Sequence, residues 1–181
     1  MLAVKRFAVG AISDREDIFA AAESCMMEYK KGNAVVAVLS AMEGQDAAAL
    51  EKARELNGNP SQREIDLLRS VGAQMTAAFL AMALEAMGME AVSLQAHQNG
   101  IYTTPDYGNG AVTHIDTGRI KTELEQGRIV LVAGDYGTTL EDEVVAICGG
   151  GDEAALLLAD ALQADCCQRI VKMDKICTAV A

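Results

Sequence analysis

The sequence predicts an α/β protein, a three-layer αβα sandwich around a mostly parallel central sheet. Short apolar runs alternate with helical patterns along the chain, and the loops between them are short. Hydrophobic residues make up 51% of the 181 residues, which is enough for the core of one domain. Tryptophan is absent and prolines number only 2, a composition typical of packed helices and strands.

The first elements follow directly from the N-terminus. Leu2–Val9 is expected to form a strand. Asp14–Lys31 is expected to form a helix, with Ser13 or Asp14 as its N-cap and Gly32 just past its end. Asn33–Leu39 is a continuous β-branched run, which is typical of a buried parallel strand.

The middle of the chain carries two helical patterns. Asp46–Leu56 is a short alanine-rich helix, and Asn57–Pro60 is a break. Ser61–Met87 is the longest helical pattern, and we expect it to be interrupted near Val71-Gly72 because glycine weakens a helix. Ala91–Leu94 is a short strand.

Strand and helix continue to alternate in the C-terminal part. We expect helices at Asp116–Glu125 and Asp152–Leu162. We expect strands at Arg128–Ala133, Val144–Cys148 and Cys167–Lys172.

Charge and cysteine content limit the function and the location. The formal net charge of −11 argues against nucleic acid or an anionic membrane as a partner. Lys5 and Arg6 are not followed by the apolar stretch of a signal peptide, so we expect a cytoplasmic protein. The 5 cysteines are odd in number and irregular in spacing, so we expect buried thiols. A redox or metal role for Cys148, Cys166 and Cys167 is the alternative.

The loops at the carboxyl ends of the strands are where a parallel sheet binds ligands. One of them, Gly149–Gly151, stands between a strand and a helix, so its amides either hold an anion or only form a tight turn. It lacks the lysine and hydroxyl of a P-loop and does not fit G-x-G-x-x-G. Asp152 is either a helix N-cap or a carboxylate beside a phosphate site.

Several of these stretches together resemble aspartokinases, of the amino acid kinase family. Arg63 begins REIDLLRSVGAQ, close to the family's R-E-x-D-x-L-L-S-T-G-E-Q. Ser40-Ala41-Met42 matches the start of S-A-M-G-G-T-T-D, and RIVLVAGDYG is similar to V-V-V-A-G-F-Q-G. Gly149–Asp165 aligns without a gap to the family's G-G-S-D-T-T-A helix and the K-A-D that follows it.

The resemblance implies an amino acid kinase-like αβα fold, with substrate in the N-terminal half and ATP towards the C-terminal half. It implies phosphoryl transfer from Mg-ATP to aspartate, which depends on positioned cations, amides and a metal ion. We expect residues 1–181 to be one such domain, truncated at the C-terminus and without the regulatory ACT domains of typical aspartokinases.

The resemblance also assigns roles to residues of this chain. Arg6 and Asp152 take the catalytic positions, and Ser40 and Gln74 the substrate positions; no residue is assigned to a metal. The phosphate and nucleotide positions fall on Gly10, Gly44, Gly149, Gly150, Gly151 and Lys172.

The family's K-F-G-G-T-S has become Arg6-Phe7-Ala8-Val9-Gly10-Ala11, so the lysine, the glycine pair and both hydroxyls are gone. Lys5 is adjacent but points to the other face of the strand.

The remaining motifs depart from the pattern as well. Glu43 replaces a glycine, Ala73 the glutamate, Cys148 the arginine and Gly151 the serine. F-Q-G is Asp135-Tyr136-Gly137, and the nucleotide-facing T-D is Val171-Lys172.

The sequence therefore predicts a non-catalytic binding or regulatory homologue of aspartokinases. The alternative is an active phosphotransferase that uses Mg-ATP on aspartate or another carboxylate. A pocket remodelled around His97, Tyr102 and Tyr107 is a further option, although we favour simple packing for His97 and His114. The resemblance implies a homodimer, or a heteromer with an active aspartokinase.

Overall fold

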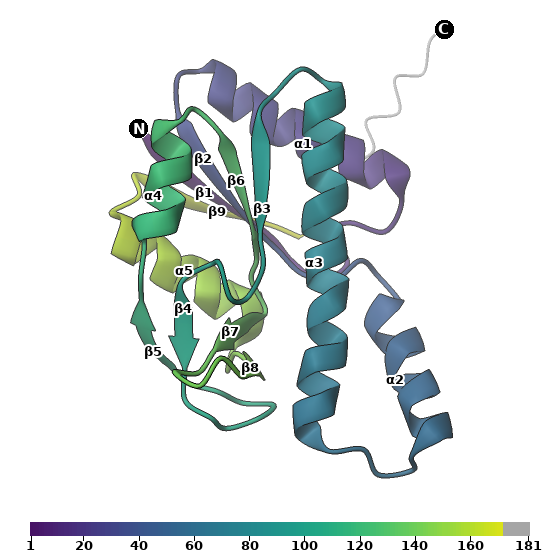
Figure 1. The fold of residues 1–181 in the computed structure, drawn as a ribbon. Coiled ribbons are helices and arrows are strands. Elements are labelled where there is room, and N and C mark those ends of the chain that lie inside the picture. Colours follow the sequence, from purple (N-terminus) through teal and green to yellow (C-terminus); the bar gives the residue numbers. More distant parts are fainter. Residues whose placement is uncertain (172–181) are drawn as a thin grey trace, which may run out of the picture.

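The computed structural model describes residues 1–171, and it has two sheets (Figure 1). The larger, sheet A, is parallel throughout and has the strand order β3-β6-β2-β1-β9. Its strands are β1 (Leu2–Phe7), β2 (Ala34–Leu39), β3 (Ala91–Leu94), β6 (Ile129–Ala133) and β9 (Cys166–Ile170). Each matches a predicted strand to within a few residues at its ends.

Within residues 1–171, five helices surround the sheets. They are α1 (Arg15–Lys30), α2 (Gln45–Leu56), α3 (Gln62–Ala86), α4 (Gly118–Glu125) and α5 (Gly150–Leu162). Asp14 caps α1 by accepting a hydrogen bond from the backbone N–H of Asp17, as one of the two predicted caps requires. Figure 1 shows α3 running along one side of sheet A and beyond it, with α2 beside its outer part.

Alternation along the buried strands divides the core into two layers. Phe7 of β1 and Leu39 of β2 pack on one face of sheet A, together with α1 and α3. Val4 and Val38 pack on the opposite face, where Leu158 of α5 contributes. The predicted αβα sandwich is therefore confirmed.

Sheet B was not predicted as a sheet. It has the order β5-β4-β7-β8, with both parallel and antiparallel pairs. Its strands are β4 (Ile101–Thr103), β5 (Val112–Ile115), β7 (Tyr136–Thr138) and β8 (Val144–Ala146). They are only three or four residues long, so three of them give too weak a pattern to recognise.

The expected interruption of the long helix is wrong, because α3 runs from Gln62 to Ala86 without a break. A Cβ on Gly72 would lie 2.8 Å from the Cβ of Ala41, so this glycine allows the loop after β2 to approach the helix. By length and composition α3 is apolar enough to cross a membrane, but its buried face, including Ala77, Leu80 and Leu84, packs in the core.

Candidate functional site

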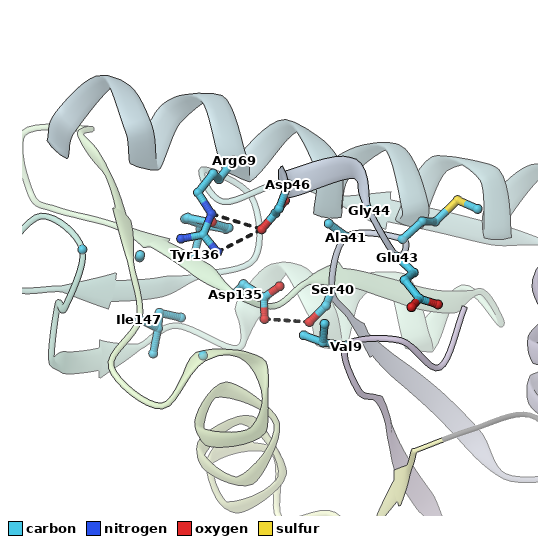
Figure 2. A pocket seen from close by; sticks show the side chains of 14 residues that line it. Val9, Ser40, Ala41, Glu43, Gly44, Asp46, Arg69, Asp135, Tyr136 and Ile147 are labelled. Carbon is cyan, nitrogen blue, oxygen red and sulfur yellow. Dashed lines mark hydrogen bonds and ion pairs between the residues drawn. The ribbon is translucent and has the colours of Figure 1, made fainter. Parts of the chain in front are cut away.

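A cavity of about 440 Å³ lies where the strands of sheet A end, between the loop after β2, helix α3 and the start of α5 (Figure 2). This is the edge at which parallel sheets present ligand sites. Its lining includes Ser40, Gly44, Asp46, Arg69, Asp135 and Tyr136.

Arg6 contacts two residues of the cavity lining, Ser40 and Asp135, and is only 3% exposed. Strand alternation turns its side chain towards α5, whereas neighbouring Lys5 donates a hydrogen bond to Ser24 of α1 on the opposite face. Its Nε donates to Asp152 (2.9 Å), Nη2 to the Ser40 hydroxyl (2.8 Å) and Nη1 to the Phe7 carbonyl (2.6 Å). The guanidinium therefore uses each of its nitrogen atoms within the fold.

Asp135 supplies a carboxyl oxygen to the first turn of α5. Its Oδ1 accepts a hydrogen bond from the backbone N–H of Gly151 and another from the Ser40 hydroxyl, both at 2.8 Å. The Arg6 Nη2 lies 3.5 Å from the same oxygen. Burial raises the pKa of Asp135 above its ordinary range, although Arg6, Ser40 and the Gly151 amide favour the ionised form.

Asp152 bridges two arginines instead of capping its helix. Gly149 is the N-cap of α5, and Asp152 lies in the first turn, where its second oxygen accepts from Arg169 Nε at 2.7 Å. Burial alone would raise the pKa of Asp152, but the hydrogen bonds from Arg6 and Arg169 outweigh it and hold the pKa below its ordinary range. The N-cap interpretation of Asp152 is wrong.

The glycine turn fits closely around Arg6. Gly149 and Gly150 have φ of +81° and +59°, which favours glycine at both positions. A Cβ on Gly151 would lie 2.5 Å from the Arg6 Cζ. The space above the first turn of α5 is thus filled by a side chain of the same protein.

The rim of the cavity carries a second set of polar groups. Arg69 of α3 donates from Nε and Nη2 to Asp46 at 3.1 and 3.0 Å, and Glu43 lies on the adjacent loop (Figure 2). Tyr136 lines the cavity next to these groups and is 3% exposed. Burial raises the pKa of Tyr136, so the phenol stays protonated at neutral pH.

The residues assigned from the resemblance do not all meet at this cavity. Ser40, Gly44 and Gly150 line it. Gly10 lies in the turn after β1, where Val9 is the lining residue, and Gln74 donates to Ser70 within α3. Lys172 lies outside the described residues.

Sequence reasoning missed the pair of Asp46 and Arg69. The available signal was that both positions depart from the quoted family patterns, where a threonine and a leucine stand. The alternative pocket does not form at this cavity. His97 contacts the Asp142 carbonyl and Tyr102 stacks on His114, and neither these side chains nor Tyr107 lines the cavity.

The cysteines follow the expectation of burial only in part. Cys25 is buried, whereas Cys148 and Cys167 are exposed. Cys148 precedes α5 and Cys166 follows it, so a helix of 13 residues, about 20 Å long, separates them. Within residues 1–171 no three His, Cys, Asp or Glu side chains gather as metal ligands.

Comparison with known proteins agrees with the geometry. The sequence model described as the amino acid kinase family matches residues 10–180. The chain is 40% identical to aspartokinase 2 of Bacillus subtilis over 167 residues, covering 92% of this chain and 41% of that protein. It is 36% identical to the aspartokinase of Mycolicibacterium smegmatis over 180 residues, covering 98% of this chain and 43% of that protein. The chain thus spans about two fifths of the length of these relatives.

Solved structures give the same fold. The aspartate kinase from Synechocystis superposes with a TM-score of 0.79 at 29% identity, over 93% of this chain and 28% of that one. E. coli aspartokinase III in complex with aspartate and ADP superposes with a TM-score of 0.76 over 93% of this chain and 48% of that one. Its identity of 16% supports the fold alone.

Proposed function

This chain belongs to the amino acid kinase family, and we propose that it is a non-catalytic, aspartokinase-like member whose phosphate site is filled by its own side chains. Its role is then to bind a ligand or a protein partner. The relatives are more than twice as long, so activity, substrate and partners are matters for direct measurement.

The observation that best supports this proposal is the position of the Asp135 carboxyl group. Its Oδ1 takes the hydrogen bond of the Gly151 N–H, a donor at the start of a helix where an anion would otherwise bind. Phosphoryl transfer relies on such donors being free for the charge that develops on the transferred group. A phosphate oxygen would have to displace Asp135 to reach this amide.

The arginine side chains at the site are also paired with carboxyl groups of the same protein. Arg6 is hydrogen-bonded to Asp152 and lies next to Asp135, and Arg169 is bonded to Asp152 as well. Two carboxyl groups therefore face two guanidinium groups, which leaves little net field to attract a polyphosphate. Glu43 at the rim adds negative charge on the approach, while Asp46 and Arg69 balance each other.

An assay of aspartyl phosphate formation tests this proposal. The purified protein is incubated with Mg-ATP and L-aspartate, and the acyl phosphate is trapped with hydroxylamine; a panel of other small carboxylic acids is run in parallel. We expect no product above the protein-free control. Turnover with aspartate or any other carboxylate would overturn the proposal and establish the alternative, an active phosphotransferase.

We also infer a homodimer that packs α3 against α3 of a second copy. Val71, Met75, Phe79 and Met82 are between 39% and 61% exposed and follow one face of the helix at intervals of three and four residues. A straight apolar stripe on one helix is self-complementary under a two-fold axis. Light scattering would give twice the chain mass, and Phe79→Asp would return it to the monomer mass; a monomeric parent protein would contradict this inference. The heteromer and the cytoplasmic location stay predictions.

A further inference from the structure

The chain contains the dipeptide Asn-Gly three times, at Asn57-Gly58, Asn99-Gly100 and Asn109-Gly110. In this dipeptide the glycine backbone nitrogen can attack the amide carbon of the asparagine side chain. The attack is intramolecular, and glycine has no Cβ to obstruct it. It also requires that the side chain is accessible and that the backbone between the two residues is able to rotate. The fold therefore decides which of the three copies reacts.

Asn99 is held at both ends of its side-chain amide. It is fully buried, its Nδ2 donates to two backbone carbonyl oxygens at 3.1 and 3.3 Å, and its Oδ1 accepts from the Ile101 N–H at 2.9 Å. A Cβ on Gly100 would lie only 1.9 Å from the carbonyl oxygen of Asp116, so the neighbouring backbone packs directly against this glycine. Neither the side chain nor the backbone has room to rearrange.

Asn109 is exposed, but the nitrogen that would attack it is not available. The Gly110 N–H donates to the Ala146 carbonyl at 2.7 Å, and the Gly110 carbonyl accepts from the Cys148 N–H at 2.8 Å. Attack by the Gly110 nitrogen would first break its hydrogen bond to Ala146.

Asn57-Gly58 has neither of these restraints. Both residues are exposed in the turn that joins α2 to α3, at the ends of these helices far from sheet A (Figure 1). Within residues 1–171 the Gly58 N–H donates no hydrogen bond, and a Cβ on Gly58 would meet nothing within 4 Å. The Asn57 side chain makes one hydrogen bond in this part of the chain, which its Oδ1 accepts from the exposed Asn59 N–H at 3.0 Å. The turn is thus open to the rotation that the attack requires.

We propose that Asn57 is a site of spontaneous covalent modification, where asparagine is converted to aspartate and isoaspartate. The Gly58 nitrogen forms a bond to Asn57 Cγ and gives up its proton to the solvent. The Cγ–Nδ2 bond breaks, and the side-chain nitrogen takes up a proton and leaves as ammonia. Water then hydrolyses the cyclic imide: cleavage at Cγ gives aspartate, and cleavage at the backbone carbonyl gives isoaspartate. Water is the only co-reactant, and nothing is oxidised or reduced.

The modification changes the end of helix α2. Asn57 is the C-cap of α2, where the helix dipole disfavours the negative charge that the reaction creates. None of the residues of α2 is buried, so the turn to α3 contributes to its placement. Isoaspartate also inserts a methylene group into the backbone of this turn. Both the charge and the backbone length of the connection between α2 and α3 therefore change, whether or not the cavity binds a nucleotide.

Mass spectrometry of proteolytic peptides tests the proposal, with the three asparagines of one chain compared directly. The folded protein and a sample in denaturant are incubated in mildly alkaline buffer, and conversion of each amide to the acid is followed over time. In the folded protein we expect Asn57 to react about tenfold faster than Asn109, the factor for one hydrogen bond that must open first. Asn99 should react more slowly still, because both its side chain and its glycine are enclosed.

The denatured sample separates the fold from the local sequence, since all three copies should react there at similar rates. Equal rates at Asn57 and Asn109 in the folded protein would overturn the proposal, and so would the same difference in rate with and without denaturant. Gly58→Ala places a methyl group beside the attacking nitrogen without a clash and should slow the reaction at Asn57 about tenfold, with Asn109 unchanged. An unchanged rate at Asn57 would also overturn the assignment, because attack by the Gly58 nitrogen would then not be the route.

Discussion

The buried network of Arg6, Asp135 and Asp152, called the floor here, and the rim, which carries Glu43, Asp46 and Arg69, use the same residue types to opposite effect. On the floor, Arg6 is buried and each of its nitrogens has a partner. At the rim, the Arg69 side chain is 38% exposed and bonded to one carboxylate. The floor is thus a buried network within the fold, whereas the rim carries a partly exposed ion pair. Under the proposed function, the chain keeps the fold of the family while its own side chains occupy the phosphate site.

The largest loss of stability is expected for a variant of Arg6. Arg6→Met would leave Asp135 without its cation and Asp152 with Arg169 alone, and loss of a hydrogen bond to a charged group costs about 1.5–3 kcal/mol. Denaturant unfolding measures the loss. Lys5→Met is the matched control, because Lys5 is a buried cation on the same strand whose hydrogen bond is to a hydroxyl. We expect the control to cost less; equal losses would mean that the carboxylates do not depend on Arg6.

A methyl group at Gly151 tests how tightly the floor is filled. Gly151→Ala places a Cβ against the Arg6 guanidinium, and such overpacking costs about 1–3 kcal/mol. Helix propensity alone would favour alanine here, so a loss of stability must come from the contact with Arg6. Gly58→Ala is the control, since a Cβ there meets nothing within 4 Å. A Gly151→Ala protein as stable as its parent would contradict the closed floor.

The pH dependence of unfolding distinguishes the two floor carboxyl groups. The pKa of Asp152 is lowered in the folded protein, so this group stabilises the fold at pH values above its ordinary pKa of about 3.9. That stabilisation is lost as the pH falls through the lower pKa of the folded protein. The raised pKa of Asp135 has the opposite sign: stability is lost as the pH rises from about 3.9 through the native pKa.

Asn variants at both positions test these opposite pH dependences of stability. Asp152→Asn should be less stable than the parent near neutral pH, with a deficit that shrinks below about pH 4. Asp135→Asn should be as stable as the parent protein in acid and should become more stable than the parent as the pH rises. Two parallel curves would contradict the different environments assigned to Asp135 and Asp152.

The smallest effect is expected at the rim. Arg69→Met removes a pair whose partners are 38% and 33% exposed, and such pairs contribute about 0–1 kcal/mol. Thermal unfolding should change little. A loss as large as that of Arg6→Met would show that the rim, too, is structural.

The sequence predicted β2 and β6 of sheet A well because they are continuous apolar runs, Ala34–Leu39 and Ile129–Ala133. It failed at Gly72, because a glycine that lets two segments approach looks the same in sequence as one that ends a helix. The site residues were harder to foresee. Asp46 and Arg69 are 23 positions apart, and only the fold of α2 against α3 shows that they meet.

Asp135 illustrates the same limit at the floor. Its departure from F-Q-G marked it as unusual, but that departure alone named no partner for its carboxyl group. The hydrogen bond to Gly151 links the loop after β6 to the start of α5, and no local pattern contains it.

Calorimetric titration of the purified protein with Mg-ATP tests the central claim most directly. A phosphate site filled by Asp135 and closed by Arg6 predicts no heat of binding up to millimolar nucleotide. Binding at micromolar concentration would contradict the claim, because the Gly151 amide and the Arg6 guanidinium would then have to be available to phosphate.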